Sequence, residues 1–137
     1  MSLRALPLIV IAFIMYNAVV LMGGSTDAVA MLRREVVPIP LMTTTLWLTW
    51  SDILILLTMG LLFIELMKST HTSTASLLDH GLSMLVFVAC LIEFLLVKAA
   101  GTASFFFITV ATLIDVIAGY SIGIRVARRD FSIGGDQ

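Results

Sequence analysis

Ionisable side chains are scarce in this sequence. Only 12% of its 137 residues are charged and 60% are hydrophobic, whereas a soluble domain carries about 25% charged residues. A single globular domain with a wetted surface is therefore excluded, and the composition indicates an integral membrane protein. The 8 basic residues are scattered among 9 acidic ones, so no basic patch is available to neutralise a run of phosphates. We expect no nucleic-acid partner.

Cysteine and histidine are nearly absent as well. The single cysteine, Cys90, lies in an apolar run, which excludes an internal disulfide and a CxxC-type metal site. Of the two histidines, His71 falls in a polar loop and His80 at the start of an apolar run, so they cannot clamp a haem between two helices at membrane depth. The sequence also lacks a Ser-His-Asp order, an HExxH motif and a glycine-rich phosphate loop. We expect no cofactor, no metal and no enzymatic activity.

What the sequence does contain is apolar runs of about the 20 residues that cross a bilayer as a helix. They predict helices at residues 3–22, 46–67, 80–98 and 104–124. The runs are continuous rather than alternating, which argues against a transmembrane barrel. The predicted fold is an all-α integral membrane protein, with residues 1–137 forming a single antiparallel bundle of four transmembrane helices. The very short connection before residue 104 makes the last two helices antiparallel neighbours.

Lysine and arginine predict the orientation of the bundle. With the N-terminus in the cytoplasm, Arg4, Lys68, Arg125, Arg128 and Arg129 lie inside, and Arg33, Arg34 and Lys98 lie outside. This distribution favours cytoplasmic N- and C-termini. The three arginines near the C-terminus belong to a short basic cytoplasmic tail, residues 125–137, and their ordinary role is contact with anionic lipid. The expected location is the bacterial inner membrane, in several passes.

The longest connection, residues 23–45, predicts a short helix on the membrane surface. Apolar residues recur there at helical spacing around charged residues between positions 28 and 36. Two prolines at positions 38 and 40 stop that helix. Trp47 and Trp50 then mark the interface where the second membrane helix enters.

Carboxylates within the apolar runs are the main functional signal, because an Asp or Glu at the centre of a spanning helix costs about 2.5–3.5 kcal/mol. These acids are Asp52, Glu65, Glu93 and Asp115; the same runs contain no Arg, and their one Lys is Lys98, the last residue of 80–98. Glu65 lies within a turn of the cytoplasmic side and is expected to pair with the lysine three residues later. Asn17, Asp52 and Glu93 share one depth and could meet, whereas Asp115 lies near mid-membrane. These residues predict either a proton or cation site or a hydrogen-bond network that fixes helix register.

The last predicted helix carries a stripe of small residues. Ala111, Asp115, Gly119 and Gly123 repeat every four residues and end in a GxxxG motif, which lets another helix backbone come close. If that helix belongs to a second copy, two Asp115 side chains would approach each other and at least one would hold a proton or bind a cation. If it belongs to a different protein, a basic partner residue is implied.

Residues 73–79 and 115–131, the latter reading DVIAGYSIGIRVARRDF, resemble uncharacterised small four-helix inner-membrane proteins of proteobacteria. The resemblance covers the second to fourth predicted helices and implies no activity. The small multidrug-resistance transporters share the size and the helix number, but their essential glutamate lies in the first helix, which has no acid here.

Two hypotheses of function follow from these patterns. The first is a non-enzymatic inner-membrane protein that acts by assembly in membrane lipid, as an accessory or structural subunit of a larger membrane complex or as a homo-oligomer. The alternative is a small proton- or cation-coupled transporter or channel that uses the intramembrane carboxylates Asp52, Glu93 and Asp115.

Overall fold

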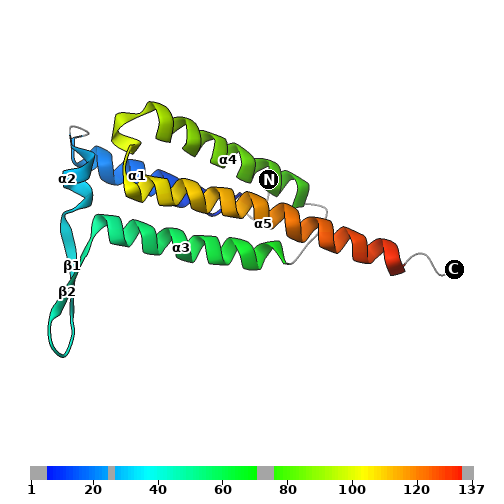
Figure 1. Cartoon of the computed structure of the whole chain (residues 1–137), viewed down its shortest axis with the longest axis horizontal. Coiled ribbons are helices and arrows are strands. Elements are labelled where there is room, and N and C mark those ends of the chain that lie inside the picture. The colour runs from blue at the N-terminus through cyan, green and yellow to red at the C-terminus, as the bar shows by residue number, and fades with distance from the viewer. Residues whose placement is uncertain (1–5, 25–26, 71–75, 134–137) are drawn as a thin grey trace.

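The computed structural model describes residues 6–24, 27–70 and 76–133, and these residues are mostly helical, as the sequence predicts. The elements are α1 (Val10–Met22), α2 (Ala28–Leu32), β1 (Glu35–Pro40), β2 (Thr45–Thr49), α3 (Trp50–Ser69), α4 (Ser76–Leu96), the 3-10 helix η2 (Lys98–Ala100) and α5 (Ala103–Ile133) (Figure 1). Arg4 and His71 lie outside the described residues, as do residues 134–137 of the predicted tail.

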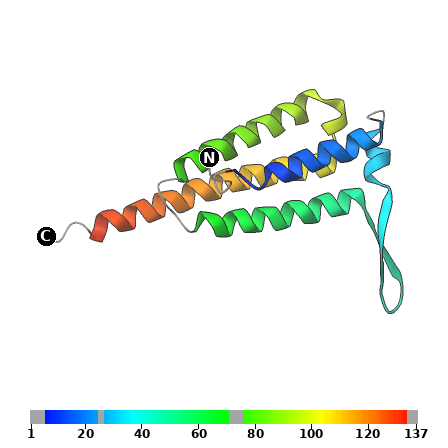
Figure 2. The same ribbon diagram turned by 180° about the vertical axis from the view of Figure 1, so that it is seen from behind.

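The long helices α1, α3, α4 and α5 run side by side along one axis (Figures 1 and 2). Helix α5 is central, because it packs against both α4 and α3, and α1 packs on α3 and α5. The tight turn η2 joins α4 to α5 and makes them antiparallel neighbours, as predicted. The β1–β2 hairpin leaves the bundle crosswise where α1 ends and α3 begins (Figure 2). We call this end of the bundle the hairpin end and the opposite one the far end.

Two helices are long and apolar enough to cross a membrane, α3 over Trp50–Ser69 and α5 over Ala103–Arg125. The apolar stretches Val10–Met22 and His80–Leu96 in the described parts of α1 and α4 are shorter. By length and composition, the structure therefore supports two of the four predicted spans.

Helix α1 begins at Val10 rather than at residue 3. The Val10 N–H donates to the Pro7 carbonyl at 3.2 Å and the Ile11 N–H to the Leu8 carbonyl at 3.0 Å, so a tight turn with bonds between residues three apart precedes the helix. The Leu8 N–H is used elsewhere, because it donates to the Glu65 carboxylate of α3 at 2.9 Å. This contact fixes the start of α1 against the far end of α3.

The second membrane helix begins at Trp50 instead of residue 46, because the preceding residues form strand β2. Their sequence, Thr-Leu-Trp-Leu-Thr, consists of residue types that favour strands, with leucine as the exception. Thr49 then caps α3: its hydroxyl accepts the Asp52 N–H at 3.3 Å, while the Asp52 carboxylate accepts the Thr49 N–H at 2.8 Å. This reciprocal capping box ends the strand and starts the helix at one position.

The short helix predicted between the first two membrane helices is present as α2, although it has only five residues. The Asp27 carboxylate caps it by accepting the Ala30 N–H at 3.0 Å. Met31 and Leu32 of α2 turn into the bundle and are buried. The chain continues as β1 rather than as further helix, so the interval that was predicted as one surface helix is a helical turn followed by a hairpin.

Helix α5 continues to Ile133 and has 31 residues. The predicted tail, residues 125–137, is therefore helical as far as Ile133. Arg125 and Arg128 are exposed on this extension, which projects beyond the other helices at the far end (Figure 1).

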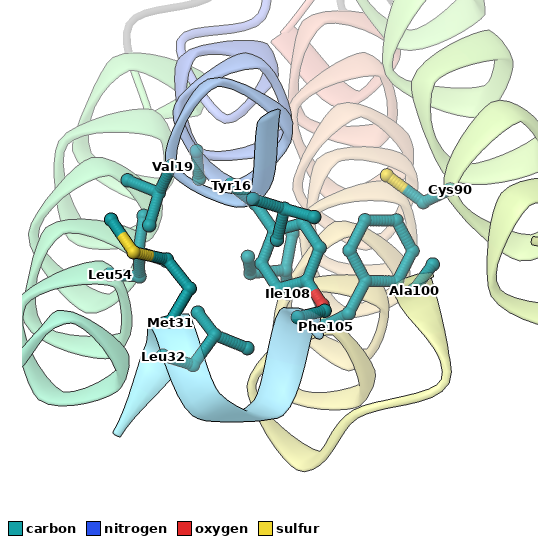
Figure 3. Packing of buried hydrophobic residues seen from close by; sticks show 12 residues of the cluster. Tyr16, Val19, Met31, Leu32, Leu54, Cys90, Ala100, Phe105 and Ile108 are labelled. Carbon is teal, nitrogen blue, oxygen red and sulfur yellow. The ribbon is translucent and has the colours of Figure 1, made fainter. Parts of the chain in front are cut away.

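The hydrophobic core gathers at the hairpin end, where all four long helices and α2 meet (Figure 3). Phe105 of α5 lies at its centre and is fully buried. The Tyr16 ring meets Phe105 edge-on with the ring centroids 4.7 Å apart, and the Phe94 ring of α4 lies nearly parallel to that of Phe105 with the centroids 6.4 Å apart. Such aromatic pairs add about 0.5–1.5 kcal/mol each beyond the area that they bury.

Candidate functional site: a polar seam between α4 and α5

Buried polar side chains line the interface between α4 and α5. We call this set the polar seam, and it consists of His80, Ser83 and Cys90 from α4 and Thr109, Thr112 and Asp115 from α5. Each of these residues exposes 9% or less of its surface. A polar group that is removed from water without a hydrogen-bond partner destabilises the protein by several kcal/mol. The seam is therefore either a network of satisfied hydrogen bonds or a functional site.

The small stripe of α5 forms the floor of the seam beneath His80. A Cβ atom added to Gly119 would lie 2.6 Å from His80 Nδ1 and 2.7 Å from Cε1, and one added to Gly123 would lie 3.5 Å from Nε2. The His80 ring also stacks on Tyr120, with the centroids 5.4 Å apart. The glycines predicted to receive another protein's helix therefore receive α4 of the same chain. Ala111 is buried on the same helix.

His80 brings an imidazole and Asp115 a carboxyl group into the seam. Among the described residues, His80 Nε2 is buried without a hydrogen-bond partner. The Asp115 carboxyl group, one helical turn before Gly119, is 5% exposed. An imidazole nitrogen can accept or donate a proton, so this end of the seam has the groups needed for proton exchange.

The two threonine hydroxyls of the seam are bonded within α5. Thr112 donates to the Thr109 carbonyl at 2.7 Å, and Thr109 donates to the Phe105 carbonyl at 3.0 Å. Such bonds from threonine to a preceding carbonyl are the usual way to satisfy a buried hydroxyl in a helix. The Cys90 thiol faces Thr112 across the interface, which extends the seam towards the hairpin end.

The structure does not bring Asn17, Asp52 and Glu93 into one site. The Asn17 side-chain amide donates to the Phe13 carbonyl of its own helix at 3.2 Å, and Asp52 is part of the α3 cap. Glu93 is partly exposed at the hairpin end of α4, one helical turn after Cys90 of the seam. Of the three, Glu93 is the one that lies near the seam.

Sequence reasoning missed the role of Tyr16. This residue is fully buried; its hydroxyl donates to the Ala99 carbonyl at 2.7 Å and lies 2.7 Å from the Thr102 hydroxyl. It thereby ties α1 to the turn between α4 and α5. A tyrosine in the middle of a mostly apolar helix was the available signal, because a buried tyrosine hydroxyl usually has a partner.

Glu65 pairs with Lys68 as predicted, with Lys68 Nζ 3.0 Å from Glu65 Oε1. The carboxylate is not at an open surface, however, since Glu65 is 3% exposed and its second oxygen accepts the Leu8 N–H. Lys68 Nζ also donates to the Leu6 carbonyl at 3.3 Å. The ion pair therefore acts as a clamp between α3 and the segment before α1.

The residues predicted at the two interfaces lie at opposite ends of the bundle. Trp47 is half-exposed on β2 and Trp50 is the first residue of α3, so both are at the hairpin end. Arg125 and Arg128 are exposed at the far end, and Arg129 is in the same helical turns, with its side chain outside the described residues. No family model matches this chain, and no curated protein or solved structure is significantly similar to it.

Proposed function

We propose that this chain is an integral protein of a bacterial inner membrane, with all four long helices embedded, and that it acts without enzymatic activity by assembly in a larger membrane complex or as a homo-oligomer. The embedding is supported by the distribution of side chains, with large apolar residues on the outer surface and polar residues inside. Ile14 of α1, Phe63 of α3, Leu85 of α4 and Phe107 of α5 each expose more than half of their surface, whereas the polar seam is internal. Soluble monomers rarely expose apolar surface on every side.

The polar groups at the two ends of α3 define the levels of the bilayer surface. From Trp50 to Lys68 the helix rises by about 27 Å at about 1.5 Å per residue, which is close to the roughly 30 Å of a hydrocarbon core. Helix α1 with its preceding turn lies between the same levels, because Leu6 contacts Lys68. We therefore propose that α1 is embedded together with the two longer helices, and that α4 is embedded as well because it packs against α5.

The observation that carries the assembly proposal is the open face of α3. Only Leu54, Thr58 and Glu65 of its 20 residues are buried, and the opposite face presents Leu56, Met59 and Phe63 around Gly60. A Cβ atom added to Gly60 would meet nothing within 4 Å. A glycine among large side chains lets a partner helix approach closely in lipid, so this face is the one that we assign to a neighbouring subunit.

The test is the mass of the particle released from native membranes in a mild detergent or native nanodisc, with every co-purifying chain identified. We expect a stoichiometric complex, and Gly60→Leu should reduce it without lowering the free energy of unfolding. Gly81→Leu is the matched control, since a Cβ added to Gly81 on α4 also meets nothing within 4 Å. Release as a monomer with lipid alone would overturn the assembly proposal.

The polar seam supports a second candidate function, proton- or cation-coupled transport. The specific observation is the buried His80 Nε2, which lacks a hydrogen-bond partner among the described residues, on the same interface as the buried Asp115. Intramembrane ionisable groups of this kind mark proton relays and ion paths.

Proteoliposomes that carry a pH-sensitive dye test this second function. Asp115→Asn keeps the shape and removes titration, so it should abolish proton-driven flux while sparing assembly. Asp52→Asn should leave the flux unchanged, because Asp52 caps α3 and lies outside the seam. Unaltered flux in Asp115→Asn, Glu93→Gln and His80→Gln would exclude coupling through this seam.

A further inference from the structure

The β1–β2 hairpin is an apolar arm that no other element covers. Its residues are exposed along most of both strands, and Met42 at the tip is fully exposed. No ionisable side chain occurs from Val36 to Ser51. A ribbon of this composition in water would be an aggregation site, so its surroundings in the assembled protein must be less polar than water.

Both faces of the arm are apolar. The strands are antiparallel and pair Ile39 with Leu46 and Pro38 with Trp47. Since paired residues share a face and neighbours alternate, one face carries isoleucine and leucine side chains, and the other carries Trp47 and the two prolines with Thr45 as its polar member. An arm that served only to cover the bundle would need one apolar face, whereas this arm can be surrounded by lipid on both faces.

The outer edge of β1 is closed to a further strand. The Leu41 N–H donates to the Thr44 carbonyl at 2.8 Å, and this bond sets the alternation of inward and outward backbone groups along the ribbon. Ile39 then faces β2, whereas Pro38 and Pro40 occupy the outward positions, where proline supplies no N–H. At the root of β2 the Thr49 N–H is taken by Asp52. These features disfavour a partner that binds by adding a strand.

The position of the arm identifies what surrounds it. It runs crosswise to the helices at the hairpin end (Figures 1 and 2), and β2 leads directly into α3, which is long enough to span a membrane. An arm at this place lies along the bilayer surface. Both tryptophans of the chain, Trp47 and Trp50, are here, and tryptophan favours the headgroup level. Arg33 and Arg34 are exposed at the root beside the exposed Glu35, and the two guanidinium groups complement lipid phosphates.

We propose that residues 35–49 form a lipid-binding arm that lies in the boundary between headgroups and acyl chains, with Arg33 and Arg34 contacting the phosphates of anionic phospholipid. The proposal rests on the membrane embedding inferred above. Each strand extends about 3.3 Å per residue, so the six residues of β1 reach roughly 20 Å from the bundle along the bilayer surface. Binding over this length fixes the depth of the hairpin end in the bilayer.

Tryptophan quenching tests this placement directly. In Trp50→Phe, Trp47 is the sole tryptophan and reports on the arm in vesicles of phosphatidylcholine, with or without phosphatidylglycerol. We expect lipids brominated near the headgroup to quench Trp47 with about a twofold larger constant than lipids brominated near the chain end, and iodide in the water to quench it weakly. Phosphatidylglycerol should increase the quenching of Trp47 by headgroup-brominated lipid, and the double variant Arg33→Gln with Arg34→Gln should abolish this increase.

A second variant separates the arm from the embedding. Leu85→Trp with Trp47→Phe and Trp50→Phe places the sole tryptophan on an exposed position of α4, about 11 residues, or about 17 Å, from the hairpin end of that helix. We expect chain-end bromine to quench it best. If Leu85→Trp is quenched by lipid and Trp47 is not, the arm proposal is overturned while the embedding stands. If neither is quenched, the embedding itself fails. Blue-shifted Trp47 emission that neither bromolipid nor iodide quenches would show that a protein, a second copy or another subunit, covers the arm, and would also overturn the proposal.

Discussion

The contact between His80 and Gly119 predicts a measurable cost for a single methyl group. In Gly119→Ala the new Cβ would lie 2.6 Å from His80 Nδ1, so the ring or the α5 backbone must move by about 0.8 Å to reach the 3.4 Å at which ordinary contact begins. The ring is also held by its stacking on Tyr120. Overpacking of this kind costs about 1–3 kcal/mol, whereas replacing a helical glycine by alanine gains about 1 kcal/mol. We expect a net loss of up to about 2 kcal/mol in the free energy of unfolding, and a loss of about 1–3 kcal/mol relative to a glycine-to-alanine change that meets no clash.

The assay is reversible unfolding in mixed micelles, in which SDS is titrated into a mild detergent and helix content is followed by circular dichroism. Gly123→Ala is the matched control, because its Cβ would lie at 3.5 Å from His80 Nε2, an ordinary contact, and it should be neutral or slightly stabilising. In a His80→Ala background the cost of Gly119→Ala should vanish. The difference between the backgrounds is then a coupling energy of about 1–3 kcal/mol.

The reasoning is refuted if Gly119→Ala is as stable as Gly123→Ala in both backgrounds. His80 would then not rest on Gly119, and the small stripe would again be free for another chain. An assembly defect in Gly119→Ala without loss of stability would lead to the same conclusion.

Three further variants test the contacts that hold the helices together. Tyr16→Phe should lower the free energy of unfolding by about 1–3 kcal/mol, because it leaves the Ala99 carbonyl without its bond, and micellar unfolding measures it. Lys68→Met should be costlier than the double variant with Glu65→Met, because the single change leaves a buried carboxylate without its cation; unfolding of both variants in the same micelles gives the comparison. Asp52→Ala removes a capping box and should cost about 1 kcal/mol, with amide exchange at the start of α3 as the local readout.

The sequence predicts the helices well because their signal is local. Composition and the long apolar runs suffice for α3 and α5, and the short connection at Lys98 gives the antiparallel pairing of α4 with α5. The hairpin escapes the same reasoning, because Leu46 and Trp47 are apolar and join the following helical run without a break. What decides between strand and helix there is the pairing with β1 and the Thr49–Asp52 cap, which a hydropathy window does not register.

The site could be predicted in part for a similar reason. Burial of Asp115 follows from its place in an apolar run, and the stripe of Gly119 and Gly123 does receive a helix. The identity of that helix depends on how α4 is placed against α5, which periodicity within one helix does not contain. For Asp52 the sequence reasoning overlooked a local contact. Its depth in the apolar run predicts an intramembrane acid, but its hydrogen-bond partner is Thr49, three residues away along the chain.

Because α4 occupies the small stripe of α5, the neighbouring subunit that we propose needs another surface, and among the described residues the outer side of α3 is open. The arm extends from the bundle past this same side (Figures 1 and 2), so a subunit that packs on Gly60 would lie next to lipid that the arm also binds. Packing in a membrane is decided by close fit rather than by removal of apolar surface from water. An arm that fixes the depth of α3 would therefore favour assembly without contacting the partner, by holding Gly60 at one level in every copy.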